Sequence, residues 1–596
     1  YLSKSIKNLQ KDIKEYNMKI KVITNKGFFN EVSTGIIKKN LWSDKNEPDK
    51  NELKKQKTYK FSHEPKISII TPTYNTPKQF LIDMIESVLN QTYSKWELCI
   101  ADGSSMEHYV KNILENYQNK DKRIKVKLLT ENKGIAGNSN EALSMATGDF
   151  MTLLDHDDTL TPYALFEIVK VINEHPDVDF IYSDEDKITE DGERRFDHYF
   201  KPDWSPDTLK SYNYPIHVSV FSKDTIKLIG GFRDGFEGSQ DYDLILRVTE
   251  KAKNIIHIPK ILYHWRVNKN STAGDTGAKL YAYVSAKKAL EEHLQRTGLK
   301  GEVKDGLWPG TKQVTYEITK LPKISIIILN KNHYEDLKKC INSIINKSSY
   351  KNFEIIIMEN GSDEENIFDF YKELKRRENI RIITWNDSFN YAAINNFAVN
   401  YAKGEILLFL NNDIEIINQD WIERMLEHAV RKEIGAVGAK LYYPDNTIQH
   451  GGVIIGIQGA AGHAHKNYHK DSPGYFARLK VIQNLSAVTA ACVMIRKEVF
   501  KEIEGFDERY TIAFNDVDLC LKIREKGYLI IWTPYAELYH YESKTRGLED
   551  TPEKQERAKK EVELLRTKWK DILDKGDPYY NPNLTLDKED FSLKYN

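Results

Sequence analysis

The sequence has no long apolar run and few cysteines. Although 40% of its 596 residues are hydrophobic, no stretch reaches the roughly eighteen consecutive apolar residues that a membrane-spanning helix needs. No basic segment followed by an apolar one marks a secretion leader, and because Tyr1 rather than Met comes first we expect further sequence upstream. Only Cys99, Cys340, Cys492 and Cys520 occur, far apart and in apolar or helical patterns. This excludes a Cys-x-x-Cys metal site and predicts buried, reduced thiols in a cytoplasmic protein.

The sequence also has almost no net charge and no glycine-rich phosphate loop. Lys and Arg number 87 against 88 Asp and Glu, a net charge of -1, so nothing favours a nucleic-acid partner. Neither Gly-x-Gly-x-x-Gly nor Gly-Lys-Ser/Thr follows an apolar strand-like run. A chain that binds phosphates without such a loop needs another means to neutralise them, and a divalent cation held by Asp is the natural one.

The chain repeats itself in the same order. KISIITPTYN at 66–75 returns as KISIIILNKN at 323–332, and WELCIADGSS returns as FEIIIMENGS. Further along, the matched pairs are GDFMTLLDHDD with GEILLFLNNDIE, GGFRDGFEGSQDYDL with EGFDERYTIAFNDVDL, and ILYHWR with ELYHYE. A constant order over five pairs indicates two similar domains and two similar sites.

Strand-like runs alternate with amphipathic segments of helical spacing, and acidic residues stand where the strands stop. This pattern predicts an α/β fold with a parallel sheet whose polar groups meet at its carboxyl edge. Ligands bind such sheets in the crevice where the strand order reverses. The interval from Asp157 to Asp413 equals that between the first strands to about one residue, but later landmarks lie roughly twenty residues further apart. We therefore expect an insertion at 451–476 in the second copy.

The ends and the joint differ from the repeats. The predicted division is a basic helical segment at 1–63, a first domain at 64–300, a linker at 301–320, a second domain at 321–550, and a C-terminal helix and tail at 551–596. The first segment has roughly twice as many lysines as acids, which favours a contact with anionic lipid as one hypothesis. Leu2, Ile6, Leu9, Ile13, Tyr16 and Ile20 have heptad spacing. Such a short heptad run packs on the body, continues upstream or makes an oligomer contact.

The motifs resemble a known family. ITPTYN, ADGSS, LLDHDD, GSQDYDL and YHWR look like the motif series of family 2 glycosyltransferases, whose nucleotide-diphospho-sugar-binding fold is called GT-A. The second half, with MENGS, FNYAAINN, LFLNNDIE, GHAH, AVTAAC, FNDVDLC and DPYYNPN, is similar to the rhamnosyltransferase-like half of large two-domain enzymes of bacterial O-antigen and capsule pathways. The resemblance covers nearly everything from residue 64 onward. It implies two tandem GT-A, Rossmann-like domains after a short helical N-terminal region.

The resemblance also implies roles for particular residues. In the first copy, Thr73, Tyr74 and Asp102 frame the base and ribose of the nucleotide, Asp155 and Asp157 bind ribose and metal, Asp241 is the general base, and His264 is a late metal ligand or diphosphate contact. In the second copy the matching residues are Glu359, Asn411, Asp413, Asp516 and His540. The implied cofactor is Mn²⁺ or Mg²⁺. The residue types suit the reaction, because a carboxylate can take the proton of an acceptor hydroxyl while a cation offsets charge on a leaving diphosphate.

The second copy departs from the first at two of these positions. Asn411 stands where the first copy has Asp155, and Glu359 stands where it has Asp102. The lost charge weakens metal binding, and the longer acid suits a different nucleotide or sugar, so we expect different donors at the two sites. An inactive second site is the competing hypothesis.

Plain structural roles compete with several of these assignments. Asp102 and Glu359 precede Gly-Ser, so they could form turns. Asp241 and Asp516 could cap helices. Residues 184–186 could end a strand in a solvated turn or contact a substrate.

Three histidines in the predicted insertion add two further alternatives. His463, His465 and His469 have a spacing that zinc could use, but no carboxylate or cysteine accompanies them at a telling distance. A mobile loop that closes over the second sugar site is the preferred alternative.

The predicted function is therefore a bifunctional, metal-dependent, inverting glycosyltransferase. It uses UDP-, dTDP- or GDP-linked sugars, acts on a glycan or lipid-linked glycan of the bacterial surface, and works in the cytoplasm, with peripheral contact to the inner face of the membrane. One alternative is that one copy catalyses while the other is a glycan-binding or scaffold module. A nucleotidyltransferase is a third option, which the missing phosphate loop disfavours.

Overall fold

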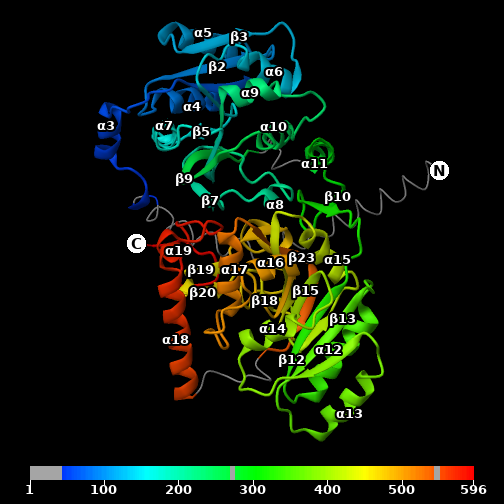
Figure 1. The fold of residues 1–596 in the computed structure, drawn as a ribbon. Coiled ribbons are helices and arrows are strands. Elements are labelled where there is room, and N and C mark those ends of the chain that lie inside the picture. Colours follow the sequence, from blue (N-terminus) through cyan, green and yellow to red (C-terminus); the bar gives the residue numbers. More distant parts are fainter. Residues whose placement is uncertain (1–42, 44, 269–275, 543–550, 596) are drawn as a thin grey trace, which may run out of the picture.

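The computed structural model describes residues 43, 45–268, 276–542 and 551–595. The predicted heptad positions between Leu2 and Ile20 lie outside these residues. The chain forms two α/β bodies, one above the other in Figure 1, and the C-terminal helix runs along the second. Among the helices that the structure describes, none has the length and apolar character needed to cross a membrane.

The first domain is built on a nine-stranded sheet in the order β3-β2-β1-β4-β8-β6-β9-β5, with β7 paired to β6. Its strands are β1 (Ile67–Thr73), β2 (Trp96–Asp102), β3 (Ile124–Leu128), β4 (Phe150–Leu153), β5 (Thr159–Leu160), β6 (Phe180–Ile188), β7 (Arg195–Tyr199), β8 (Ser219–Ser222) and β9 (Ile255–Arg266). Its helices are α4 (Lys78–Leu89), α5 (His108–Lys120), α6 (Gly134–Leu143), α7 (Ala164–Glu174), α8 (Pro206–Leu209), α9 (Lys223–Ile229), α10 (Gln240–Thr249) and α11 (Thr276–Thr297), preceded by α3 (Lys50–Thr58).

The second domain repeats this order strand for strand. Its ten-stranded sheet runs β14-β13-β12-β15-β22-β17-β23-β16, with β18 paired to β17 and β21 to β23. The strands are β12 (Ile324–Asn330), β13 (Phe353–Glu359), β14 (Ile380–Thr384), β15 (Ile406–Leu410), β16 (Ile414–Ile416), β17 (Ile434–Tyr442), β18 (Ile448–His450), β21 (Gln483–Leu485), β22 (Cys492–Arg496) and β23 (Leu529–His540). The helices are α12 (Tyr334–Lys347), α13 (Glu365–Leu374), α14 (Tyr391–Val399), α15 (Trp421–Ala429), α16 (Lys497–Glu502) and α17 (Asn515–Glu525).

The predicted insertion has structure of its own. It holds the hairpin β19 (Val453–Ile455) and β20 (Ala461–His463) and the short helices η1 (Ile457–Gly459) and η2 (Tyr475–Lys480). The predicted linker is also ordered, as the antiparallel hairpin of β10 (Gly301–Asp305) and β11 (Lys312–Tyr316). After the second domain come α18 (Pro552–Lys568), α19 (Lys570–Lys575) and a tail of turns in which Leu584 and Leu593 form an isolated β-bridge.

The apolar patterns explain why these elements form. All seven residues of β2 are buried, as expected for a parallel strand with helices on both faces. On α4, Phe80, Leu81, Met84, Ile85 and Val88 are buried, and their spacing gives one apolar stripe against the sheet. The alternation of such strands and helices was visible in the sequence, and the predicted fold class is confirmed.

The strand order places a crevice in each domain. The chain adds β2 and β3 on one side of β1 and then returns to β4 on the other side, and all of these pairs are parallel. The crevice of such a sheet opens at the carboxyl ends of the two strands where the direction of winding reverses. Thr73 ends β1, and Asp155 follows β4 by two residues. The ends of β12 and β15 occupy the same places in the second domain.

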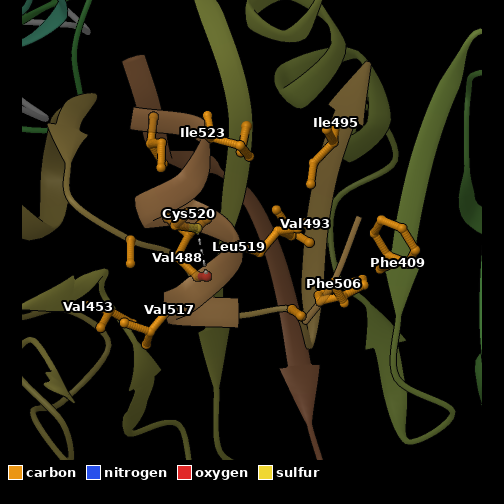
Figure 2. Packing of buried hydrophobic residues seen from close by; sticks show 14 of the residues in the cluster. Phe409, Val453, Val488, Val493, Ile495, Phe506, Val517, Leu519, Cys520 and Ile523 are labelled. Carbon is orange, nitrogen blue, oxygen red and sulfur yellow. Dashed lines mark hydrogen bonds between the residues drawn. The ribbon is translucent and has the colours of Figure 1, made fainter. Parts of the chain in front are cut away.

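A buried cluster fixes the helix that carries Asp516. Figure 2 shows Val517, Leu519, Cys520 and Ile523 of α17 packed with Val493 and Ile495 of β22 and with further apolar side chains. The Cys520 thiol donates to the Val488 carbonyl at 3.6 Å. All four cysteines are buried and outside any disulfide, as the sequence predicted. The start of α17 is thereby held against the sheet.

The insertion reaches the other domain and does not hang free. Tyr475 Oη donates to the His198 carbonyl at 2.7 Å and accepts from the Phe200 amide at 2.8 Å. The ring of Phe476 stacks on Tyr199 with centroids 4.1 Å apart. This part of the insertion joins the domains, and closure of the loop over the second site stays a prediction.

Candidate active sites

The predicted nucleotide edge of the first domain is a fixed turn. Asp102 Oδ1 accepts from Thr73 Oγ1 at 2.9 Å and from Ser105 Oγ at 2.6 Å, and its Oδ2 accepts from the Ser105 amide at 2.9 Å. The turn-forming role is therefore real. Tyr74, which follows Thr73 along the chain, is 41% exposed. Contact of these residues with a nucleotide stays a prediction.

Glu359 forms the matching turn in the second domain. Its carboxylate accepts from the amide of Ser362 at 2.5 Å, from Ser362 Oγ at 2.8 Å and from Tyr371 Oη at 2.5 Å. The longer side chain of Glu359 thus reaches Tyr371 on α13. Among the described residues, the shorter Asp102 makes no matching contact with a helix. This difference gives the substitution a structural reason, and the nucleotide contact again stays a prediction.

The acidic run after β4 holds carboxylates with different surroundings. Asp158 is fully buried and accepts from Tyr263 Oη at 2.6 Å and from the Arg266 amide at 2.7 Å. Asp157 accepts from Asn268 Nδ2 at 3.0 Å. Asp155 lines a pocket between β1, β4 and α10 instead. The sequence did not single out Asp158, because its contacts are with residues of β9 more than a hundred positions further along the chain.

The predicted base shares this pocket with Asp155. Asp241 and Asp155 both line it, together with Pro72, His217 and Tyr263. Burial, with the nearby charges of Asp157 and Asp241, raises the pKa of Asp155 to about 7. Burial likewise raises the pKa of Asp241 to about 6. Carboxylates with such raised pKa values in one pocket are typical of a functional site.

Neither predicted base is a helix cap. Asp241 is the second residue of α10 and Asp516 the second of α17, and the capping positions belong to Ser239 and Phe514. Both carboxylates lie in the first turn, where the helix dipole favours negative charge. Asn213 Nδ2 donates to Asp241 Oδ2 at 3.1 Å, and the Ala490 amide donates to Asp516 Oδ2 at 3.1 Å. Neither acid is therefore the N-cap residue, although Asp516 Oδ1 accepts from the Val517 amide at 2.9 Å within the first turn. The role of Asp241 and Asp516 as bases stays a prediction.

A cluster of potential metal ligands lies at the pocket of the first domain. Its residues differ in part from the metal ligands that the sequence predicted. Ligand atoms of Asp155, Asp158 and His217 lie within 4.8 Å of one another. Burial and the Lys201 charge lower the pKa of His217 to about 3, so its imidazole is neutral and able to coordinate a metal. No sequence pattern pointed to His217, because its place beside the aspartates comes from the pairing of β8 with β4.

His264 lies in another cluster. Its Nδ1 is 2.6 Å from Asp186 Oδ1, and Asp186 also accepts from Arg195 Nε at 2.6 Å and faces His198 Nδ1 at 3.3 Å. Burial alone would raise the pKa of Asp186, but the surrounding His264, His198 and Arg195 hold it well below its usual range. Residues 184–186 thus lie buried within β6, and the solvated turn that the sequence allowed is absent.

The two late histidines differ because their strands pair in different registers. His540 lies opposite the residue that directly follows Asp413, whereas His264 lies opposite the second residue after Asp157. Neighbouring residues of a strand point to opposite faces, so a shift of one residue changes which groups a side chain meets. His540 lies beside Asp413, whereas His264 lies directly opposite Asp186 of β6 and contacts its carboxylate. The role of His264 as a metal ligand stays a prediction.

The second site brings its predicted ligands together. His540 Nε2 lies 3.3 Å from Asp413 Oδ1 and 3.2 Å from Asn411 Nδ2. Asp413 Oδ1 is buried and accepts no hydrogen bond from the described residues. A buried carboxylate oxygen beside an imidazole nitrogen and a carboxamide is a donor set that suits a divalent cation. The pocket of the first domain suits one as well, since burial and the charges of Asp157 and Asp241 raise the pKa of Asp155.

The three histidines of the zinc hypothesis do not converge. His463 Nδ1 lies 2.9 Å from His450 Nδ1, whereas His465 stacks on Phe591 at 4.3 Å. His469 is exposed beside Asp471. Within the described ranges, the cluster in the first pocket is the one group of three or more such ligands that lie together.

Two sheets of one strand order, each with acids at its crevice, define a tandem GT-A protein. A family model described as Glycosyl transferase family 2 matches residues 68–227 and 325–504. The matched regions cover more than half of the chain, one in each domain, and the chain belongs to this family.

Two relatives match along most of this chain, and a third matches along less than half of it. The chain is 45% identical over 534 residues to the uncharacterized protein y4gI of Sinorhizobium fredii, covering 89% of this chain and 58% of that protein. It is 35% identical over 557 residues to the O-antigen biosynthesis protein RfbC of Myxococcus xanthus, covering 93% and 43%. A chondroitin synthase of Escherichia coli is 29% identical over 40% of this chain and 34% of its own length. The chain thus spans about half the length of its two longest matches.

Proposed function

We propose that the chain is a bifunctional, inverting glycosyltransferase that transfers sugars from nucleotide-diphospho-sugars to a growing bacterial surface polysaccharide or glycan. One observation carries the proposal: each domain holds a carboxylate in the first turn of a helix, Asp241 or Asp516, beside the polar residues that follow its central strand. Family membership of both regions supports it. The relatives named for O-antigen biosynthesis and for chondroitin synthesis agree with a polysaccharide product.

The residues divide the work of a single displacement. Ionised Asp241 accepts the proton of the acceptor hydroxyl while the hydroxyl oxygen attacks the anomeric carbon and the nucleoside diphosphate leaves. A single displacement inverts the anomeric configuration, so one carboxylate on the acceptor side is enough. Asp155 and Asp157, with Asp158 and His217 close by, would hold Mn²⁺ or Mg²⁺ in the first domain. A bound cation offsets the charge that accumulates on the leaving diphosphate.

In the second domain Asp516 takes the place of the base. Asn411, Asp413 and His540 would hold the cation, with one negative charge less than in the first domain. We take the second site to be active because these groups lie together. The altered acid at Glu359 and the missing charge at Asn411 favour a different donor there.

Single substitutions of the two bases test this function. Asp241→Asn should abolish transfer of one sugar and leave the other, and Asp516→Asn should do the reverse, as followed by product analysis with UDP-, dTDP- and GDP-linked donors. Loss of both transfers from Asp241→Asn alone would show one catalytic site, with the second domain as a glycan-binding or scaffold module.

Our proposals for the acceptor and for the location of the protein are drawn from the sequence. We propose a glycan or lipid-linked glycan acceptor, reached from the cytoplasm, with the basic residues 1–62 in contact with the membrane surface. Deletion of these residues should reduce sedimentation with anionic vesicles. Unchanged sedimentation would end the membrane hypothesis.

A further inference from the structure

A histidine pair ends two strands at the second site. His450 is the last residue of β18 and His463 the last of β20, and their Nδ1 atoms lie 2.9 Å apart. The rings are nearly perpendicular, with centroids 5.1 Å apart and an angle of 85°. His450 is fully buried, whereas His463 is only partly covered. The first domain has no counterpart of β20, so the pair belongs to the second domain alone.

The backbone fixes which nitrogens carry protons. The Thr489 amide donates to His450 Nε2 at 3.4 Å, so the proton of a neutral His450 is on Nδ1. That Nδ1–H donates to His463 Nδ1, which leaves the proton of a neutral His463 on Nε2. Burial lowers the pKa of His463 to about 4 and holds that of His450 well below its usual value. Both rings are therefore neutral near pH 7, and the chain of donors ends in a fixed N–H group.

The backbone ties this histidine pair to the proposed base. Thr489, whose amide donates to His450 Nε2, precedes Ala490, whose amide donates to Asp516 Oδ2 at 3.1 Å. Besides burial, the charges that act on His463 come first from Asp516, the proposed base, and then from Lys466, Glu542 and His540. Among the described residues no hydrogen-bond partner occurs for His463 Nε2. A transferred sugar and its acceptor must both come between the base and the diphosphate ligands, where sugar hydroxyls would meet this donor.

We infer that His463, oriented by His450, binds a sugar hydroxyl in the second site through its Nε2–H. This inference rests on the proposed transferase function and deepens it. It assigns to the insertion a part in sugar selection that the first domain lacks. There His198, on the strand β7 that corresponds to β18, faces the Asp186 carboxylate at 3.3 Å instead.

The test uses the full chain with Asp241→Asn, so that the remaining transfer comes from the second domain. His463→Phe keeps an aromatic ring and removes the donor. His469→Phe is the matched control, because His469 lies on the same insertion with its side chain 64% exposed. The KM values for donor and for acceptor are measured separately. Binding of UDP-, dTDP- and GDP-linked sugars is compared by calorimetry with binding of the nucleoside diphosphates alone.

We expect His463→Phe to raise one KM about fivefold or more, as the loss of one buried hydrogen bond predicts. A raised donor KM with unchanged binding of the nucleoside diphosphate assigns the hydroxyl to the donor sugar, and a raised acceptor KM assigns it to the acceptor. His450→Phe should give a smaller loss, because it frees the proton of His463 to move to Nδ1. A melting temperature within the range of the His469→Phe control shows that the fold is intact.

Unchanged KM values and unchanged binding of every nucleotide sugar in His463→Phe would overturn the inference. The failure of the wider proposal looks different. In that case the Asp241→Asn background transfers nothing before any histidine is changed, while the calorimetric comparison still reports whether His463 contacts a nucleotide sugar.

Discussion

At the scale of single residues, the two crevices contain similar groups in different electrostatic states. In the first, the charges of Asp157 and Asp241 add to burial in raising the pKa of Asp155, and burial raises the pKa of Asp241. In the second, Asn411 removes one charge, and His540 joins Asp413. We expect these differences to give each proposed site its own response to pH and to metal concentration.

The base of the first domain should give a visible acid limb. Asp241 acts when ionised, and burial raises its pKa to about 6, so the rate of the first transfer should fall as the pH drops through that value. Asn213→Ala removes a hydrogen bond that stabilises the ionised carboxylate, so the limb should move to higher pH. The pH–rate profile of each transfer checks this. The second transfer should keep its profile in Asn213→Ala, and a first profile that also stays fixed would argue against Asp241 as the base.

Exchange of Asp and Asn after the central strands should change the metal requirement of the two sites in opposite directions. Asn411→Asp adds a carboxylate beside Asp413 and should lower the Mn²⁺ concentration for half-maximal second transfer by about tenfold, because carboxylates bind hard cations better than amides do. Asp155→Asn should raise the corresponding concentration for the first transfer. Titration of each transfer with Mn²⁺ gives both values. Equal metal requirements in Asn411→Asp and the unaltered chain would place the cation elsewhere.

The sequence predicted part of this site and missed part. Acids at strand ends are visible because apolar runs mark the strands, so Asp102, Asp155 and Asp413 could be found. His217 could not, since the pairing of β8 with β4 brings it into place, and the buried role of Asp158 depends on its contacts with Tyr263 and Arg266 of β9. The one-residue difference between the partners of His264 and His540 is likewise invisible in the matched motifs YHWR and YHYE.

At the scale of elements, the C-terminal helix α18 supports the loop before Asp516. Glu561, on α18, is 3% exposed, and its carboxylate accepts from the amides of Thr511, Ile512 and Ala513 and from Thr511 Oγ1. One carboxylate thus orders the segment that leads into α17. The sequence predicted this helix from its apolar spacing, but a buried acid on a charged helix gave no sign of this contact.

Glu561→Gln should therefore impair the second transfer selectively. The side-chain NH2 of the introduced glutamine would face backbone N–H groups that now donate to the carboxylate. Leaving such buried donors unsatisfied costs about 1–3 kcal/mol, so the rate of the second transfer should fall roughly tenfold. The first transfer should be unaffected. Glu563→Gln, an exposed neighbour on the same helix, is the control. Equal effects on both transfers would mean general destabilisation and not a local role.

At the scale of the whole molecule, the domains interlock. Asp207 on α8 of the first domain is 2% exposed on its side chain and accepts from Arg431 Nη1 of the second at 2.7 Å. Its Oδ2 accepts from Asn484 Nδ2 at 2.9 Å. The tail that follows the second domain returns to the first, where Asn581 Nδ2 donates to Asp184 Oδ2 at 2.9 Å. Repeats and periodicity revealed two domains, but contacts between segments hundreds of residues apart leave no pattern in the sequence.

Breaking the buried pair should uncouple the domains. Asp207→Asn removes the buried charge that faces Arg431 and Lys210 and leaves Arg431 only the more exposed Glu433 as a counter-charge, a change that costs up to about 3–5 kcal/mol. Calorimetry should then show a lower melting temperature and two separate transitions, while Glu174→Gln, an exposed change on α7, should leave the melting curve unaltered. A single transition at the original temperature in Asp207→Asn would show that this pair does not hold the domains together.

The central claim is that one chain carries two working transfer sites with different donors. Nucleotide release from UDP-, dTDP- and GDP-linked sugars, with Mn²⁺ or Mg²⁺, tests it most directly when the unaltered chain is compared with Asp157→Ala and Asp413→Ala. The account predicts that each substitution abolishes release from a different donor. If Asp413→Ala changes nothing while Asp157→Ala abolishes all release, the second domain is a binding module and the claim is wrong.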